Sequence, residues 1–149
     1  EKDAKKLMAV LPLLFERFGL GLHPGKTRLV DFRRPKQTVY EESPGSCPKP
    51  GIFDLLGFTH YWGRTRRGGF VVKRKTAKDR FGRSLSRAAK WCRNNRHLPL
   101  RIQYQNLVRK LQGYYQYYGI IGNHQALSRF LYEVKRVWRK WLDRQSQKR

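Results

Sequence analysis

Residues 123–145, NHQALSRFLYEVKRVWRKWLDRQ, decide the fold class of the second half of this chain. At 100° per residue, the apolar side chains of this stretch fall on one arc of a helix, namely Leu127, Phe130, Leu131, Val134, Val137, Trp138, Trp141 and Leu142. The basic side chains fall outside that arc, namely Arg129, Lys135, Arg136, Arg139, Lys140 and Arg144. The stretch therefore predicts an amphipathic helix with one face for packing and a basic face left over.

Two further helices are predicted upstream, over residues 76–95 and 100–118, with Pro99 opening the second. The apolar stripe of the second consists of Tyr104, Leu107, Val108, Leu111, Tyr114, Tyr115 and Tyr118. The stripe of the first is narrower and consists of Phe81, Leu85, Ala88 and Cys92. Three such helices can bury their stripes together as a small bundle with a basic exterior.

The first half has a different pattern. Apolar spacings of three and four predict a helix over residues 4–18, which Pro12 should kink or restart. A turn over 22–27 and a short strand over 28–32 should follow. Residues 33–51 are rich in Pro and Gly, which predicts a mobile surface loop.

Two further strands are predicted between residue 53 and the first of the three helices. Residues 53–62 are apolar on both alternating faces, which predicts a strand. A basic, glycine-containing tip over 63–69 and a second strand over 70–72 complete a predicted hairpin. Three segments are therefore expected: residues 1–62, a connecting hairpin at 63–75, and a helical part at 76–149.

Charge is distributed very unevenly between the two halves. Residues 1–60 contain 10 Lys and Arg and 7 Asp and Glu, a net charge of +3. The rest of the chain holds 34 − 10 = 24 basic and 10 − 7 = 3 acidic residues, a net charge of +21. Such a surface repels itself unless a polyanion neutralises it, and nucleic acid is the expected polyanion.

Other classes of protein find little support. Cys47 and Cys92 lack metal-ligand spacing, so both are expected to be free thiols in a cytoplasmic protein. The longest apolar run, residues 7–15, is too short to cross a membrane, so no membrane partner is expected. The four histidines are too scattered for a metal site.

Four strings resemble motifs of the bacterial group II intron reverse transcriptases that double as intron maturases. Residues 19–27, GLGLHPGKT, are similar to the late palm motif of that family, and residues 55–58, LLGF, to its primer grip. Residues 111–119, LQGYYQYYG, and 130–138, FLYEVKRVW, look like its maturase-specific thumb, called domain X. Leu55 stands where the family more usually has Phe, an apolar exchange that leaves the turn at Gly57 intact.

The resemblance implies an α+β fold: the helix-strand remnant of a right-hand polymerase palm and a β-hairpin, followed by a three-helix thumb bundle. It implies binding of intron RNA, to support splicing, and of an RNA template with a DNA primer for polymerisation. The family's catalytic Asp pair, which holds Mg²⁺, would lie upstream of residue 1. The full-length protein is thus expected to be an RNA-directed DNA polymerase, and this chain alone to be inactive and without a metal.

Candidate site residues follow from the motifs and from the charge. Lys26 matches the lysine of the palm motif and could serve as an accessory cation near leaving pyrophosphate. Leu56, Gly57 and Phe58 are the expected primer grip, where a glycine lets the backbone approach a ligand. Tyr117 points away from the apolar stripe of its helix and is a candidate for stacking on an RNA base.

The expected phosphate contacts are basic residues on the hairpin and on the outer faces of the helices. They are Arg64, Arg66, Arg67, Lys73, Arg74, Lys75, Lys78, Arg80, Arg83, Arg87, Lys90, Arg93, Arg109, Lys110, Arg129, Arg136, Arg139 and Lys140. An alternative interpretation is a stand-alone, non-catalytic RNA-binding factor of splicing or of a ribonucleoprotein. A DNA-binding protein is less well supported, because no helix-turn-helix or zinc-finger spacing occurs.

Overall fold

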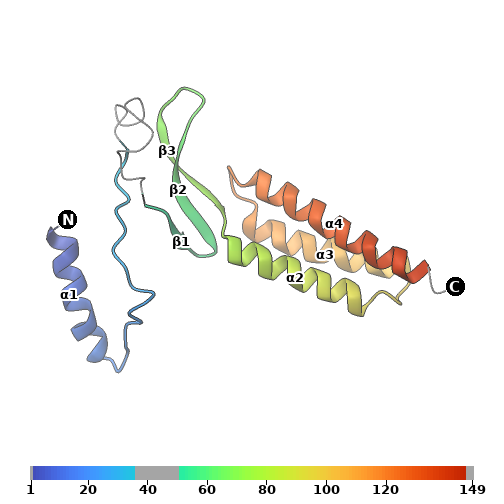
Figure 1. The fold of residues 1–149 in the computed structure, drawn as a ribbon, viewed down its shortest axis with the longest axis horizontal. Coiled ribbons are helices and arrows are strands. Elements are labelled where there is room, and N and C mark those ends of the chain that lie inside the picture. Colours follow the sequence, from blue (N-terminus) through green and yellow to red (C-terminus); the bar gives the residue numbers. More distant parts are fainter. Residues whose placement is uncertain (1, 36–50, 147–149) are drawn as a thin grey trace. The chain divides into compact units, whose positions relative to one another are not determined.

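The computed structural model describes residues 2–35 and 51–146 and confirms an α+β chain (Figure 1). In these residues the elements are α1 (Lys2–Glu16), β1 (Phe53–Leu55), β2 (Phe58–Arg64), β3 (Phe70–Thr76), α2 (Lys78–Asn94), α3 (Leu100–Tyr118) and α4 (His124–Ser146). The chain divides into two compact units, residues 1–52 and residues 53–149, so the hairpin clusters with the three helices. No helix in the described ranges carries an apolar stretch long enough to cross a membrane.

The first unit contains α1 and a turn. The helix runs through Pro12 without a break, which excludes the restart; the kink stays a prediction. None of its residues is buried, and Leu7, Val10 and Leu14 are all exposed. After α1 the predicted turn is present, because the amides of Lys26 and Thr27 both donate to the carbonyl of His23 at 3.0 Å.

The predicted strand over 28–32 is wrong, since these residues carry no strand assignment. A strand needs a neighbour along its length, and the backbone hydrogen bond described here is a single one, from Gly51 N to Asp31 O at 2.9 Å. Without a ladder the apolar pattern alone does not make a strand. Most of the predicted loop over 33–51, with Cys47, lies outside the described residues.

The second unit begins with a three-stranded antiparallel sheet in the order β1-β2-β3. The single strand predicted over 53–62 is wrong, because a two-residue turn at Leu56 and Gly57 divides it and pairs Leu55 with Phe58. β3 continues to Thr76, well past the predicted end at 72. The hairpin of β2 and β3 is confirmed, with Arg64 paired to Phe70 at its tip.

The three-helix bundle is confirmed, and the predicted helix ends lie within two residues of the observed ones. The buried core consists of Cys92, Leu107, Tyr114, Tyr118, Phe130 and Val134. Apolar side chains from all three stripes pack around it, among them Phe81, Leu85, Trp138 and Trp141. One predicted stripe residue, Tyr104, is instead 58% exposed, because it lies at the margin of the arc and only tilts against Trp138.

Two buried polar side chains, which the apolar pattern did not predict, connect the elements of the bundle. Gln103 is 1% exposed; its Nε2 donates to the carbonyls of Arg96 and Leu98, and its Oε1 accepts from Trp138 Nε1 at 3.0 Å. Asn123 is also 1% exposed, and its side chain forms hydrogen bonds with Thr76 at the end of β3 and with Tyr118 at the end of α3. Each buried amide is thus fully paired, as burial of a polar group requires.

Candidate nucleic-acid interface

The turn at the predicted primer grip has an unusual backbone. Leu56 has φ +50° and Gly57 has φ +82°, and positive φ at both central residues is the geometry of a type I′ hairpin turn. Asn or Asp normally occupies the first position, and an aliphatic residue there is strained by about 1–2 kcal/mol. Leu56 is 75% exposed in this turn, so the strained backbone presents an apolar side chain to solvent.

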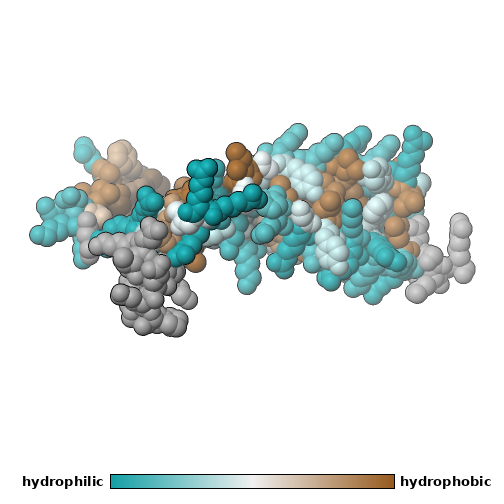
Figure 2. Space-filling view, turned by 90° about the horizontal axis from the view of Figure 1, so that it is seen from above, coloured by the Kyte–Doolittle hydropathy of each residue, from teal (hydrophilic) through white to brown (hydrophobic). Residues whose placement is uncertain are grey.

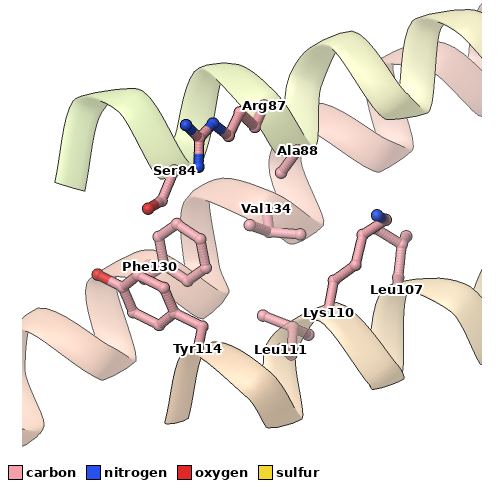
Figure 3. Close-up of a pocket in the computed structure, with 9 residues that line it drawn as sticks. All are labelled: Ser84, Arg87, Ala88, Leu107, Lys110, Leu111, Tyr114, Phe130 and Val134. Atoms are coloured by element: carbon pink, nitrogen blue, oxygen red, sulfur yellow. The ribbon is translucent and has the colours of Figure 1, made fainter. Parts of the chain in front are cut away.

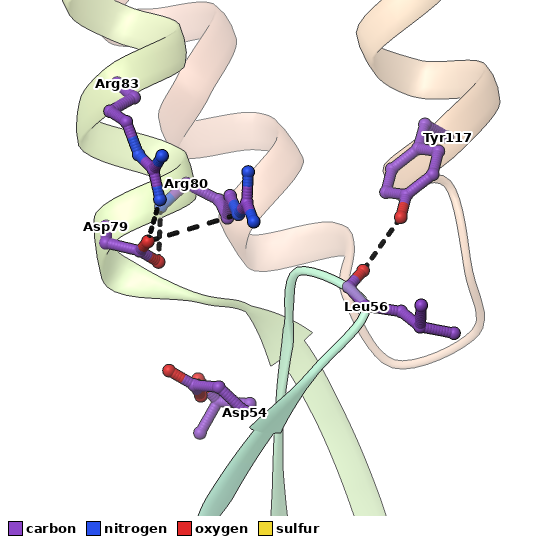
Figure 4. Close-up of polar contacts among 7 residues, drawn as sticks. Asp54, Leu56, Asp79, Arg80, Arg83 and Tyr117 are labelled. Carbon is purple, nitrogen blue, oxygen red and sulfur yellow. Dashed lines mark hydrogen bonds and ion pairs between the residues drawn. The ribbon is translucent and has the colours of Figure 1, made fainter. Parts of the chain in front are cut away.

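The end of α3 supports this turn, as Figure 4 shows for Tyr117. The Tyr117 hydroxyl donates to the carbonyl of Leu56 at 2.8 Å. A Cβ at Gly57 would lie 3.3 Å from the Tyr118 hydroxyl oxygen, a tight contact, so the surroundings favour glycine here in addition to the positive φ. Phe58 stacks on Tyr117 with ring centroids 6.0 Å apart and meets Tyr118 edge-on at 5.4 Å. The predicted primer grip is therefore held by the end of α3.

Tyr117 is 55% exposed, which confirms that it points away from the core. Its hydroxyl and part of its ring already contact the turn, so base stacking remains a prediction for the outer ring face alone.

We expect Tyr117→Phe to loosen the strained turn, because the substitution removes only the hydroxyl that bonds to Leu56. The loss corresponds to about 1 kcal/mol, so hydrogen exchange of the Gly57 and Phe58 amides should become about fivefold faster. Hydrogen exchange followed by NMR measures this directly. Tyr104→Phe is the matched control, since the Tyr104 hydroxyl makes no hydrogen bond among the described residues. Equal exchange rates in both variants would mean that the hydroxyl does not hold the turn.

The hairpin places basic side chains on both faces of the sheet and at its tip. Arg66 and Arg67 lie in the exposed tip, and Arg74 lies on β3 opposite His60. The stem of Lys73 crosses Gly63, where a side chain would come within 2.6 Å of Lys73 Cδ, and Lys75 Nζ lies 5.1 Å from the centroid of the Tyr61 ring. These long cations are spread along the strands rather than collected at one point.

The outer faces of the helices carry the remaining predicted phosphate contacts, and all of these side chains are exposed. Figure 2 shows hydrophilic side chains along both margins of the helical part on the side in view. Among the described basic residues of α2, α3 and α4, ion pairs are formed by Arg80, Arg83 and Arg136. Acidic side chains therefore neutralise a small part of this surface.

Two of the paired carboxylates, Asp79 and Asp31, have lowered pKa values. The hydrogen bond from Arg83 lowers the pKa of Asp79, and Arg33 lowers the pKa of Asp31 to about 2 (the first pair is drawn in Figure 4). Burial raises the pKa of the Cys92 thiol to about 11, so this free cysteine is a packing residue at neutral pH.

Comparison with known proteins does not add to this picture. No protein family, curated protein or solved structure matches this chain. The functional interpretation therefore depends on the site itself.

The predicted site residues fall into two sets. Leu56, Gly57, Phe58 and Tyr117 come together, and the basic residues of the hairpin and helices belong to the same compact unit. Lys26 is exposed in the turn of the other unit. Its accessory role stays a prediction.

The described carboxylates do not fit the Mg²⁺ that the family resemblance implies. Asp79 is engaged by Arg80 and Arg83, and Asp54 accepts a hydrogen bond from Thr59. No group of three or more His, Cys, Asp or Glu residues that could hold a metal occurs within residues 2–35 and 51–146. We therefore derive no metal-dependent step from these residues.

Proposed function

We propose that this chain is the carboxyl-terminal part of a group II intron reverse transcriptase and maturase, and that it binds structured RNA through the hairpin and the bundle. The exposed and largely unpaired cationic surface is the observation that carries the proposal. Cations that lack acidic partners repel one another, and RNA phosphates would relieve that repulsion.

The strained turn adds support for a nucleic-acid ligand at the same surface. Backbone strain is retained where the surrounding structure enforces it, and it is often found at functional sites. Here Tyr117 and Tyr118 enforce the turn that corresponds to the primer grip. The proposed contact is to the backbone or terminal sugar of a primer, made by the exposed Leu56 and by Gly57.

A rigid bundle suits recognition of folded RNA. Double-stranded RNA is recognised mainly by its shape and through phosphate and 2′-hydroxyl contacts, so arginine and lysine should outnumber residues that read bases. The exterior of α2, α3 and α4 has this composition. As a separate chain it is expected to bind RNA without polymerising nucleotides.

Salt titration tests the proposal on the unmodified chain. We expect binding to a structured RNA whose affinity falls by about 0.7–0.9 log units, per log unit of salt, for each phosphate neutralised. With about six contacts the affinity should fall roughly 10³-fold between 50 and 200 mM salt. Fluorescence anisotropy with a labelled RNA stem-loop gives the slope. A flat response, or no binding at 50 mM salt, would remove the electrostatic basis of the proposal.

A further inference from the structure

A pocket of about 270 Å³ opens between α2 and α3 (Figure 3). Both helices pack on α4, whereas α2 and α3 approach each other less closely. Phe130 and Val134 of α4 line the space between them, and Ala88, Leu107 and Leu111 form apolar walls. The pocket is thus built into the bundle rather than formed by a surface loop.

Two hydroxyl groups and two cations also line the pocket. Figure 3 shows the hydroxyl groups of Ser84 and Tyr114 at the same end of the pocket. The Tyr114 hydroxyl is buried beside the Thr76 side chain, without a partner in hydrogen-bond geometry among the described residues. Arg87 from α2 and Lys110 from α3 line the pocket from opposite sides. Both are exposed and form no ion pair within the described part of the chain.

This combination defines the chemistry of a ligand. An apolar space of this volume lies just below the usual range of about 300–1,000 Å³ for small-molecule sites, so it fits one ring system. The hydroxyl groups can hydrogen-bond to the edge of such a ring. Arg87 and Lys110 favour an anion attached to it. A flat ring with a polar edge and a neighbouring phosphate is a nucleotide.

We infer that the pocket between α2 and α3 binds the unstacked base of one unpaired RNA nucleotide, with Arg87 and Lys110 on the flanking phosphates. The inference rests on the proposed RNA-binding function and adds a single-nucleotide specificity to it. Sequence-specific proteins commonly recognise RNA through splayed-out bases of bulges and loops. A partner protein that presents an aromatic residue beside an acidic one is the competing occupant.

The test compares three RNA stem-loops of one sequence: fully paired, with a single-nucleotide bulge, and with an abasic nucleotide at that bulge. We expect the unmodified chain to bind the bulged RNA about tenfold more tightly than the other two, since stacking of one base contributes a factor of that order. Ala88→Leu, which fills the pocket, should abolish the preference and leave affinity for the paired RNA unchanged. Ser86→Leu is the matched control, because Ser86 is exposed on the same helix outside the pocket lining.

The outcomes are distinguishable. Equal affinity for all three RNAs, or a preference that survives in Ala88→Leu, overturns the inference while RNA binding stands. Absence of binding to every RNA at 50 mM salt contradicts the proposed function itself. If Ala88→Leu does not fold by circular dichroism, Ser84→Leu and the comparison of bulged with abasic RNA on the unmodified chain decide. A protein partner would be the occupant if the three RNAs bind equally and if an Asp-Phe peptide binds the unmodified chain but not Ala88→Leu. That result likewise overturns the inference.

Discussion

Replacing Asn123 with Ala is expected to destabilise the folded chain by about 3 kcal/mol. Asn123 Nδ2 donates to Thr76 Oγ1 at 2.8 Å and to the carbonyl of Tyr118 at 2.9 Å, and its Oδ1 accepts from the Thr76 amide at 2.9 Å. The substitution removes all three hydrogen bonds; the Thr76 amide loses its acceptor, whereas the Tyr118 carbonyl still accepts the Ile120 amide at 2.8 Å. Because Thr76 and Asn123 are almost fully buried, water does not readily replace the lost hydrogen bonds.

The effect should be large because Asn123 joins three elements at one point. Thr76 ends β3, Tyr118 ends α3, and Asn123 directly precedes α4. Its own carbonyl also accepts the amides of Ala126 and Leu127, so the residue closes the first turn of α4. Loss of its side chain therefore loosens the junction between hairpin and bundle as well as removing hydrogen bonds.

Urea denaturation followed by circular dichroism measures this loss, which corresponds to a midpoint lower by about 1.5 M. Asn106→Ala is the matched control. Asn106 Nδ2 makes one hydrogen bond, to the Ile102 carbonyl of its own helix, so its removal should change stability by no more than about 0.5 kcal/mol. Similar midpoints for the two variants would contradict the role assigned to Asn123.

Replacing Arg66, Arg67 and Arg74 together with Ala should weaken RNA binding about a hundredfold at 0.1 M salt. These residues are exposed on the hairpin and form no ion pair within the described part of the chain. Each phosphate contact releases a counterion from the RNA on binding, and the variant loses up to three such contacts. The slope of log affinity against log salt should therefore fall by about 2–3. Salt titration of both proteins by fluorescence anisotropy provides both quantities.

The expected loss of affinity is assigned to the position of the three arginines and not to net charge alone. A control variant with the same net charge separates these two explanations. Lys2→Ala, Lys6→Ala and Arg17→Ala together remove the same three charges from the first unit, where each of these side chains is exposed. That variant should keep the slope within about one unit and lose little affinity. If it weakens binding as much as the hairpin variant, RNA contacts are distributed over the whole chain and the proposed interface is wrong.

Local patterns predicted the helices well. The stripe of Phe130, Val134 and Trp138 recurs at spacings that only a helix brings to one face, and the core is built on it. Exposure of Arg139 and Lys140 followed from the same projection. The prediction was wrong for Tyr104, which lies at the edge of the apolar stripe and is exposed. The stripe does not show how much of its width a neighbouring helix will cover.

Local patterns did not predict the strands correctly. Residues 53–62 appeared to be one strand because Leu56 is apolar, and nothing in its side chain indicates a positive φ. The turn exists because Tyr117, 61 positions away in sequence, bonds to it and because Gly57 fits against Tyr118. The segment over 28–32 likewise lacked the neighbour that a strand requires.

The α+β class, the three amphipathic helices and the concentration of positive charge after residue 60 follow from the order of the amino acids, since helical period and charge are properties of neighbouring residues. The burial of Gln103 and Asn123, the strained turn at Leu56 and the pocket between α2 and α3 arise from the packing of the folded chain. These features depend on contacts between residues that are distant in the chain, and a linear pattern does not encode which distant groups will meet.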